Sequence, residues 1–190
     1  MPATEGVAAV ILAGGQGSRM GGVDKGLIDY RGRPLIEWTL AAIAPQVEEL
    51  VISANRNLDV YAGYGRRVLP DTLPDYPGPL AGVLAALQAV NAEWLLVVPC
   101  DTPHLSADLA ARLLAAARQE NVPLAIAADD MYTHHTCFIV RTDQRDALAA
   151  FLARGERAVR RWQAELPFVE VRFDAAAFAN LNRPEDLSDS

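Results

Sequence analysis

Glycines and two cations gather directly after the first apolar run of the chain. The run Val7–Leu12 predicts a strand, and the loop that follows it contains five glycines together with Arg19 and Lys25. Backbone amides in such a loop form a concave site for an anion, and glycine lets a phosphate approach without a Cβ in the way. Arg offers a rigid fork for phosphate oxygens, and Lys a movable point charge. The segment therefore predicts a site for a phosphate-bearing ligand rather than a glycine-rich surface turn.

Two common phosphate-binding loops do not fit this segment. The dinucleotide-binding fingerprint needs a third glycine where this chain has Met20, and an acid after the next strand, where residues 53–55 read Ser-Ala-Asn. A P-loop needs Ser or Thr after its lysine, whereas Lys25 is followed by Gly26. The loop therefore belongs to neither class.

A carboxylate follows the strongest central run. Asp101 comes shortly after Trp94–Val98, and Pro99 and Pro103 stiffen its surroundings. Protein-bound Mg²⁺ usually takes one or two carboxylates plus phosphates and water, so Asp101 is a candidate metal ligand. The alternative is an Asp that caps the next helix, but Ser106 lies closer to the expected start of that helix.

Polar residues also follow two other apolar runs. Asn55 comes directly after Leu50–Ala54, and it can read a base or ribose or adopt a left-handed conformation. Asp71 follows Val68–Pro70, where a turn-forming Asp is an equally good interpretation. In open α/β sheets the ligand lies beyond the carboxyl ends of the strands. The loops after four apolar runs can therefore meet around one ligand.

Short apolar runs alternate with helical patterns along most of the chain. Most runs are rich in Val, Ile and Leu without alternation, as expected of strands buried on both faces. The expected strands are Val7–Leu12, Leu50–Ala54, Arg67–Leu69, Trp94–Val98, Leu124–Ala127, Thr136–Val140 and Phe168–Phe173, and the expected helices lie near Pro34–Ala44, Pro79–Val90, Ala107–Arg118 and Asp143–Ala153. This order predicts one α/β domain over residues 1–190, with helices on both sides of a mostly parallel sheet.

Local signals refine this outline. Pro79 suits a first helical position, and Ser106 suits an N-cap with Asp108 in the first turn. After about Asp129 strands and helices stop alternating. We expect the same sheet to continue there, with an antiparallel strand.

The composition excludes several classes of protein. The 190 residues carry a net charge of −7 and no basic block, so duplex nucleic acid is not an expected partner. No apolar stretch is long enough for a membrane span, and the first residues lack the features of a signal peptide. Cys100 and Cys137 form no CxxC pair, which favours free thiols in a reducing cytoplasm. His134 and His135 are adjacent, so on a strand they would face opposite ways and could not share a metal.

Residues 12–25 also match a long and specific family pattern. The pattern Leu-Ala-Gly-Gly-x-x-x-Arg-Met-Gly-Gly-x-Asp-Lys runs from Leu12 to Lys25, and in it the chain resembles the molybdenum cofactor guanylyltransferases (molybdopterin-guanine dinucleotide synthases). Further matches follow in the family's order at residues 75–82, 99–103, 155–157 and 180–182. The resemblance covers nearly the whole chain and implies a Rossmann-like, three-layer nucleotidyltransferase fold with a mixed sheet.

The resemblance also implies that about residues 1–101 bind the nucleotide and about residues 102–190 bind the pterin. The GTP-binding residues that it implies are Leu12, Ala13, Gly14, Gly15, Lys25, Ser53, Asn55, Asp71 and Asp101. The implied catalytic residues are Arg19, Lys25 and Asp101, and Asp101 is also the implied Mg²⁺ ligand. The implied molybdopterin-binding residues are Asn180 and Asn182. Ser53 stands where the family often has Asn, and His135 where it commonly has Pro.

Several residues keep two interpretations. Asp24 either holds Lys25 in place or is a plain surface acid. Gly155, Arg157 and Arg161 either contact a phosphate or belong to a solvated helix face.

The expected reaction joins GMP, from GTP, to the terminal phosphate of molybdopterin, which normally bears molybdenum, and pyrophosphate leaves. The attacking phosphate oxygen is already ionised at pH 7, so no general base is required. The sequence accordingly holds no Ser/His/Asp or Cys/His constellation. Catalysis would come from alignment and from charge neutralisation by Mg²⁺, Lys25 and Arg19.

The expected partners are GTP and molybdopterin, together with molybdenum-insertion proteins and apo-molybdoenzymes or their chaperones. One alternative is a cytidylyltransferase or sugar-phosphate nucleotidyltransferase of the same fold. Cytidine-specific relatives typically have Ala where this chain has Gly14, so Gly14 discriminates against them. The other alternative is a GTP-binding module without turnover, against which the intact Arg19, Lys25 and Asp101 argue.

Overall fold

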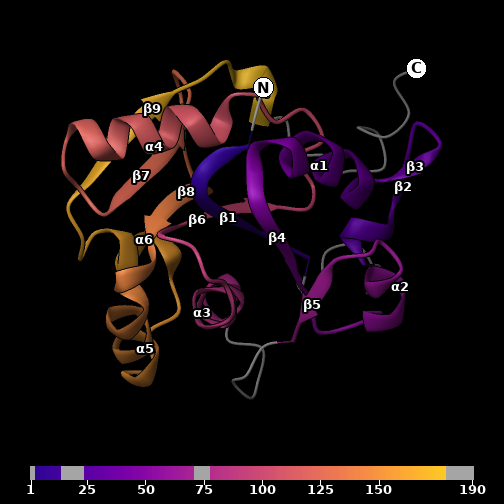
Figure 1. Ribbon diagram of the computed structural model, residues 1–190, viewed down its shortest axis with the longest axis horizontal. Coiled ribbons are helices and arrows are strands. Elements are labelled where there is room, and N and C mark those ends of the chain that lie inside the picture. The colour runs from indigo at the N-terminus through magenta and orange to yellow at the C-terminus, as the bar shows by residue number, and fades with distance from the viewer. Residues whose placement is uncertain (1–2, 14–23, 71–77, 179–190) are drawn as a thin grey trace.

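A seven-stranded sheet forms the middle layer of the protein (Figure 1). The computed structural model describes residues 3–13, 24–70 and 78–178. The strands, in their order across the sheet, are β5 (Arg67–Leu69), β4 (Val47–Ser53), β1 (Thr4–Leu12), β6 (Trp94–Pro99), β8 (Thr133–Arg141), β7 (Leu124–Ala128) and β9 (Phe168–Arg172). Strand β8 runs antiparallel to both of its neighbours, and the other neighbouring pairs are parallel.

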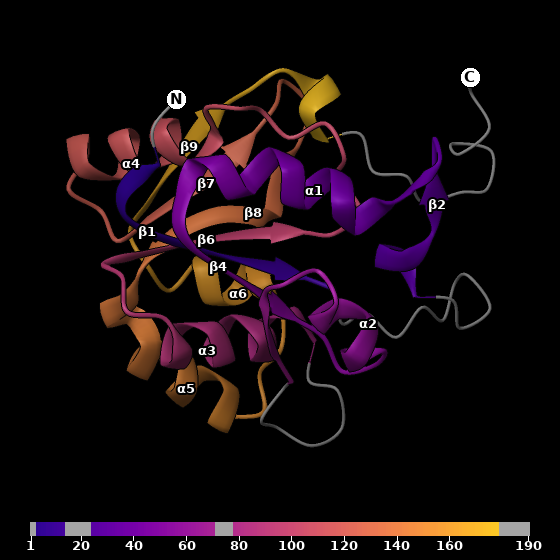
Figure 2. The ribbon, with the colours of Figure 1, turned by 45° about the vertical axis from the view of Figure 1, so that its right-hand side comes forward.

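Helices cover both faces of this sheet. Helices α1 and α4 lie on one face, and α3, α5 and α6 lie on the other (Figure 2). The helices are α1 (Leu35–Ile43), α2 (Leu58–Ala62), α3 (Pro79–Ala89), α4 (Leu109–Gln119), α5 (Arg145–Ala153) and α6 (Val159–Gln163). Short 3-10 turns span Lys25–Leu27, Ala44–Gln46, Thr142–Gln144 and Ala175–Phe178, and β2 (Asp29–Tyr30) pairs with β3 (Arg33–Pro34) in a small hairpin. The predicted three-layer α/β fold is confirmed.

Strand β1 shows why the apolar runs do not alternate with polar residues. Val7, Ala9 and Ile11 pack into the core on the α1 and α4 side. Ala8 and Val10 pack into the core on the α3 and α5 side. Both faces of the strand are therefore apolar, as in other sheets covered on two sides.

Helix α3 is buried almost all round. Every residue from Leu80 to Leu87 is buried. Gly78 precedes the helix with a positive φ of 84°, and Pro79 occupies its first turn, as predicted. A helix that is apolar on all sides belongs in the interior, and α3 packs against β1, β4 and β6.

The structure contains every strand and helix that the sequence predicts, with bounds shifted by a few residues. It adds α2, α6 and the β2–β3 hairpin, which are too short for periodicity to reveal. The expected antiparallel strand near the end of the sheet is β8. The prediction that Ser106 is an N-cap is wrong. Helix α4 begins at Leu109 after Asp108, and the Ser106 hydroxyl donates to the Asp108 carboxylate at 2.5 Å instead.

Candidate active site

Four strands end level with one another at one edge of the sheet. Leu12 at the end of β1 is in register with Ser53 of β4 and with Pro99 of β6, and Ser53 is in register with Leu69 of β5. The backbone N–H of Ala13 donates to the Ser53 carbonyl at 2.8 Å, which holds β1 and β4 together past their last paired residues. The loops that carry the predicted site residues therefore leave the sheet from the same edge.

An ion pair joins two of the predicted site residues at this edge. The Lys25 Nζ lies 3.1 Å from Oδ2 of Asp101, and the two side chains are 31% and 14% exposed. Lys25 opens the 3-10 turn Lys25–Leu27, and Asp101 lies in the turn after β6. The structure thus brings together a cation and a carboxylate that are far apart in the sequence. Asp101 does not cap α4, which starts at Leu109.

Asp24 is a buried carboxylate that fixes the turn beneath Lys25. Its Oδ1 accepts the Tyr61 hydroxyl at 2.5 Å and the Gly26 backbone N–H at 3.3 Å. Its Oδ2 accepts the Asn57 amide at 2.9 Å. Asp24 is only 8% exposed, so the interpretation of a surface acid is wrong and the holding role agrees with the structure.

The groups behind this turn stay protonated. Burial, reinforced by the hydrogen bond to Asp24, raises the pKa of Tyr61 far above its ordinary value. Burial likewise raises the pKa of the Cys100 thiol, with the nearby Asp101 carboxylate adding to the rise. A Cβ on Gly26 would lie 2.6 Å from the Tyr61 hydroxyl and 3.5 Å from the Cys100 sulfur. The turn is therefore close-packed, and Tyr61 acts as a permanent donor.

Ser53 lies beneath helix α3. It is 3% exposed, and a Cβ on Gly82 would lie 2.3 Å from its hydroxyl oxygen. The same Cβ would lie 3.1 Å from the side chain of Leu12. Glycine at position 82 thus lets α3 rest directly on the ends of β1 and β4, and any contact that Ser53 makes with a nucleotide comes from a largely covered hydroxyl.

The remaining predicted residues divide into two sets. Leu12, Ala13 and Asn55 lie at the same edge, at the ends of β1 and β4. The residues that lie outside the described part of the chain are Gly14, Gly15, Arg19, Asp71, Asn180 and Asn182. Sequence reasoning missed Asn57 and Tyr61. Asn57 adopts φ 51°, a left-handed conformation that Asn tolerates, but no sequence signal linked either residue to Asp24.

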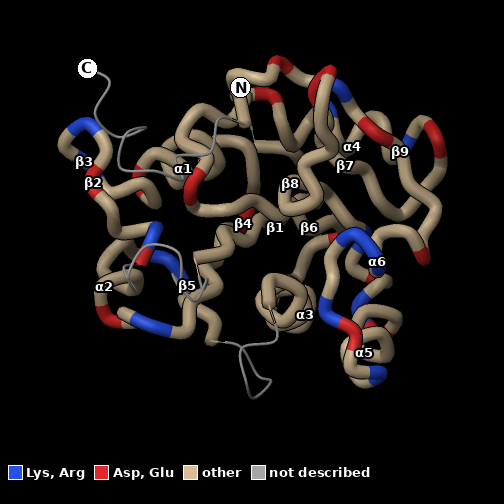
Figure 3. Tube along the Cα trace, turned by 180° about the vertical axis from the view of Figure 1, so that it is seen from behind, with Lys and Arg blue, Asp and Glu red and all other residues tan. Residues whose placement is uncertain are grey.

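Arg157, which precedes α6, and Arg161 within α6 contact groups in their own neighbourhood. Basic residues gather along α5 and α6 (Figure 3). The Arg157 guanidinium donates to the carbonyls of Leu152 and Glu156 at 2.8 and 2.7 Å, and Arg161 pairs with Glu156 at 3.0 Å. These contacts agree with the interpretation of a solvated helix face.

The two adjacent histidines have different partners. The His134 Nε2 lies 2.9 Å from Oδ2 of Asp129, whereas the His135 Nδ1 lies 2.7 Å from Oε1 of Gln163. Among the described residues no group of three or more His, Cys, Asp or Glu side chains is arranged to hold a metal.

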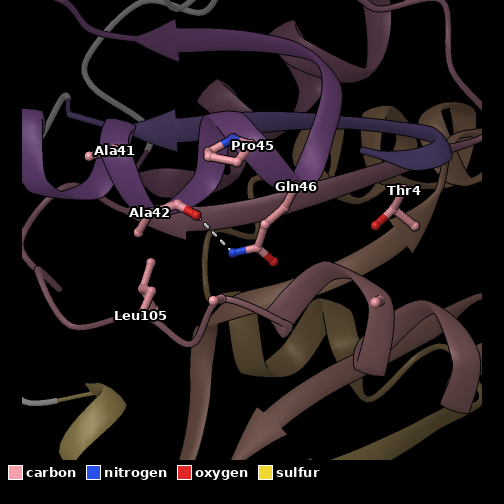
Figure 4. Close-up of a pocket in the computed structure, with 8 residues that line it drawn as sticks. Thr4, Ala41, Ala42, Pro45, Gln46 and Leu105 are labelled. Carbon is pink, nitrogen blue, oxygen red and sulfur yellow. Dashed lines mark hydrogen bonds between the residues drawn. The ribbon is translucent and has the colours of Figure 1, made fainter. Parts of the chain in front are cut away.

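A cavity of ≈ 210 Å³ lies between α1 and α4 (Figure 4). Gln46 is its main polar residue, and the Gln46 amide makes three hydrogen bonds. It donates to the carbonyls of Ala42 and Ser106 at 2.9 Å each and accepts the Ala110 N–H at 3.0 Å. Because these bonds tie the two helices together, we assign Gln46 a structural role.

Comparison with known proteins identifies the class. Residues 9–169 match the family model of the MobA-like NTP transferase domain. The structure superposes on the crystal structure of molybdopterin-guanine dinucleotide biosynthesis protein A from Archaeoglobus fulgidus with a TM-score of 0.79 and 24% identity, covering 95% of this chain and 94% of that one. The structure also superposes on that of 2-C-methyl-D-erythritol 4-phosphate cytidylyltransferase from Thermus thermophilus. The TM-score is 0.73 at 23% identity, and the match covers 98% of this chain and 96% of that one. The fold and the edge site define a nucleotidyltransferase.

Closer relatives narrow the class further. The chain is 46% identical over 179 residues to the molybdenum cofactor guanylyltransferase of Shewanella baltica, covering 93% of this chain and 91% of the relative. It is 45% identical over 181 residues to the molybdenum cofactor guanylyltransferase of Shewanella amazonensis, covering 94% of this chain and 92% of the relative. The chain therefore belongs to the molybdenum cofactor guanylyltransferase family. No helix in the described ranges is long and apolar enough to cross a membrane.

Proposed function

We propose that this protein transfers GMP from GTP to the terminal phosphate of molybdopterin and releases pyrophosphate. One observation carries the proposal. In a chain 46% identical to a named guanylyltransferase, Lys25 and Asp101 form a half-buried pair 3.1 Å apart at the carboxyl ends of β1 and β6. This is the edge at which open α/β sheets bind their ligands. The pair supplies a cation for a phosphate and a carboxylate for a metal.

The donor set fits Mg²⁺. Among the described residues Oδ2 of Asp101 contacts Lys25, while Oδ1 has no protein partner. Mg²⁺ seldom uses a complete protein cage, because it keeps water and substrate phosphates among its ligands. One available carboxylate oxygen beside a phosphate site therefore suffices. Bound there, Mg²⁺ would neutralise charge on the leaving pyrophosphate.

The protein's own contribution is alignment and fixed charge. Asp24, Asn57 and Tyr61 hold the turn of Lys25, so its ammonium is already in place before a triphosphate arrives. Positive charge fixed in advance stabilises a transition state in which charge moves onto the leaving group. The nucleophile is a phosphate oxygen of the substrate, so proton removal by the protein is not needed. The raised pKa of Cys100 agrees with this, because a protonated buried thiol is a poor nucleophile.

The proposal extends to residues outside the described part of the chain. We assign Gly14, Gly15, Arg19 and Asp71 to the nucleotide, and Asn180 and Asn182 to the pterin. Residues 1–101 then supply the nucleotide half of the site and residues 102–190 the pterin half. The family supports a cytoplasmic enzyme that passes its product to molybdenum-insertion proteins, apo-molybdoenzymes or their chaperones.

A nucleotide panel tests the proposal. The protein is mixed with Mg²⁺, molybdopterin and GTP, CTP, ATP or UTP, and pyrophosphate release is followed. We expect GTP to be used at least about tenfold better than CTP, because a site that hydrogen-bonds one base rejects another. Preference for CTP would favour the cytidylyltransferase alternative, and binding of GTP without release would favour a carrier module.

Asp101→Asn tests the role of the ion pair between Lys25 and Asp101. It removes the negative charge that would hold the metal and that pairs with Lys25, so turnover should fall by about 10²-fold or more while the fold persists. Asp143→Asn is the matched control, because it breaks an exposed ion pair with Arg141 far from the site edge. Equal turnover in the two variants would refute a direct role for Asp101.

A further inference from the structure

Helix α1 carries a polar residue on its buried face. The buried residues of this helix are Leu35, Ile36, Thr39 and Ile43, and Thr39 has no exposed surface. A buried hydroxyl costs free energy unless it finds an acceptor. In a helix a Thr hydroxyl commonly bonds to the carbonyl one turn earlier. The Thr39 Oγ1 instead donates to the Cys100 carbonyl, 61 positions along the chain, at 3.3 Å. Thr39 therefore links α1 to the turn after β6.

Cys100 is held on three sides in this turn. Its N–H donates to the carbonyl of Leu12, at the end of β1, at 3.2 Å. Its carbonyl accepts the Thr39 hydroxyl, and its buried sulfur would lie 3.5 Å from a Cβ on Gly26. Cys100 is thus in contact with β1, with α1 and with the turn of Lys25 at once.

The bond from Thr39 also bears on the next residue, Asp101. The Cys100 carbonyl and the Asp101 N–H belong to one peptide group, which is planar and resists twisting. Fixing this carbonyl therefore fixes the plane from which the Asp101 side chain departs. On the following side, the buried Thr102 hydroxyl donates to the Pro99 carbonyl at 3.2 Å. Asp101 accordingly stands between two residues that hydroxyl bonds hold in place.

The Asp101 carboxylate faces outward from this support. Its side chain is 14% exposed and its Oδ2 lies 3.1 Å from the Lys25 Nζ. We infer that Thr39 is a positioning residue for Asp101, because its bond to the Cys100 carbonyl sets where the carboxylate meets Lys25 and a bound metal. The inference rests on the proposed function, since it takes Asp101 as the Mg²⁺ ligand. Thr39 acts only through Asp101.

A positioning role and a packing role at residue 39 make different demands. Valine has nearly the shape of threonine without the hydroxyl, so a packing role would survive Thr39→Val. A positioning role would not, because the Cys100 peptide group would lose the bond that fixes its plane. Removing the partner of a metal ligand typically lowers metal affinity by about 10–100-fold. The turn of Lys25 should keep its place, because Asp24 holds it independently.

Three variants separate these roles. Thr39→Val removes the hydroxyl, and Thr39→Ser keeps it but loses a methyl group. Thr142→Val is the matched control, because the Thr142 hydroxyl donates to the carbonyls of Ala92 and Glu93 at 2.9 and 3.0 Å, next to the opposite end of β6. For each variant we would measure the Mg²⁺ concentration that gives half-maximal turnover, Tm, and hydrogen exchange of the Cys100 N–H by NMR. Electron paramagnetic resonance would measure Mn²⁺ binding to the complex with GTP.

We expect Thr39→Val to raise the Mg²⁺ concentration for half-maximal turnover by about tenfold and to weaken Mn²⁺ binding by a similar factor. Exchange of the Cys100 N–H should become faster. Thr39→Ser should keep a metal affinity within about twofold of wild type, since the hydroxyl remains. Thr142→Val should lower Tm by about 2–4 °C, as Thr39→Val does, yet leave metal affinity and Cys100 exchange unchanged.

Three results would overturn the positioning role. One is wild-type metal affinity and wild-type Cys100 exchange in Thr39→Val. Another is an equal loss of metal affinity in Thr39→Val and Thr39→Ser, which would make packing rather than the bond responsible. The third is the same loss in Thr142→Val, which would mark a general effect of lowered stability.

Failure of the proposed function would look different. The wild-type protein would then release no pyrophosphate from GTP and molybdopterin, whatever the Mg²⁺ concentration. In that event weaker Mn²⁺ binding to the GTP complex of Thr39→Val, together with faster Cys100 exchange, still supports the positioning role. Mn²⁺ binding that is equal or absent in both proteins refutes it.

Discussion

Asp24 and Asp129 are two buried carboxylates at the same edge of the sheet, and they hold their turns in different ways. Asp24 accepts a phenol, an amide and one backbone N–H, and the phenol and amide come from residues 37 and 33 positions away, respectively. Asp129 accepts two backbone N–H groups and an imidazole, all within five positions. One carboxylate therefore fastens two distant segments together, and the other closes a local turn.

The comparison of Asp24 with Asp129 indicates how each turn responds to a change of pH and to substitution. The donors around Asp24 do not titrate near neutral pH, because the pKa of Tyr61 is raised still further by burial. The Lys25 turn therefore keeps one geometry over a wide pH range. The turn at Asp129 depends on a carboxylate whose pKa is lowered by the backbone N–H groups that it accepts, so its geometry responds to acid. We expect substitutions to have larger effects at the tertiary contact than at the local one.

Asp24→Ala should have the largest effect. It leaves the Tyr61 hydroxyl and the Asn57 amide without their acceptor, and each buried unpaired donor costs about 1–3 kcal/mol. Because the Lys25 turn also loses its anchor, turnover of GTP should fall by about 10²-fold. Urea unfolding and pyrophosphate release measure the two effects. Wild-type turnover in a folded Asp24→Ala protein would show that the network does not position Lys25.

Tyr61→Phe sharpens the comparison by removing one hydroxyl. We expect a loss of about 1 kcal/mol in the free energy of unfolding and a severalfold drop in turnover. The drop should be the same from pH 6 to pH 9, since burial raises the pKa of Tyr61 and keeps its hydroxyl protonated over that range. Tyr64→Phe serves as the control, because Tyr64 is near in sequence but has no bond to Asp24. An equal drop in both variants would contradict the role given to Tyr61.

Asp129→Asn should have a smaller effect, and one that depends on pH. The pKa of Asp129 is lowered in the folded protein. Its contribution to stability is therefore present above the unfolded value of about 3.9 and disappears as the pH falls through the folded value. The variant should have a lower Tm than wild type at pH 7, and the difference should shrink below about pH 4. A difference in Tm that does not change with pH would mean that the charge of Asp129 is not what holds the turn.

The smallest effect concerns the two buried thiols, of which Cys100 lies near Asp24. Cys100 and Cys137 are 6% and 1% exposed, and burial raises the pKa of both. A thiol reagent at pH 8 should label neither cysteine in the native protein and both after unfolding. Rapid labelling of Cys100 alone would show that the Lys25 turn opens in solution.

The sequence predicts most of this fold because its strands are long and apolar. The pairing of Lys25 with Asp101 follows from the rule that parallel strands end at one edge. The network at Asp24 could not be predicted in the same way. Tyr61 lies in a helix of five residues and looks like a core aromatic, and nothing in the local pattern points to an acid 37 positions away. The sequence alone therefore leaves the role of Asp24 open between anchor and surface acid.

The far side of the site shows the same limit. The apolar run predicts a strand at Thr136–Val140, but β8 begins at Thr133 with a bulge that no periodicity reveals. That bulge decides the partners of His134 and His135. The contact between His134 and Phe178 joins segments separated by two helices and a strand, so only the folded chain brings the two rings together.

The single reversed strand has a consequence for the order of folding. Because β8 runs back beside β7, the two strands can pair as soon as a short turn closes, and local pairing is fast. The pairing of β1 with β6 joins Val7 to Trp94 and must wait for a long loop to close. We therefore expect pulse-labelled hydrogen exchange to protect the β7–β8 pair before β1. The half of the molecule assigned to the pterin would then form its hairpin while the half assigned to the nucleotide is still unstructured.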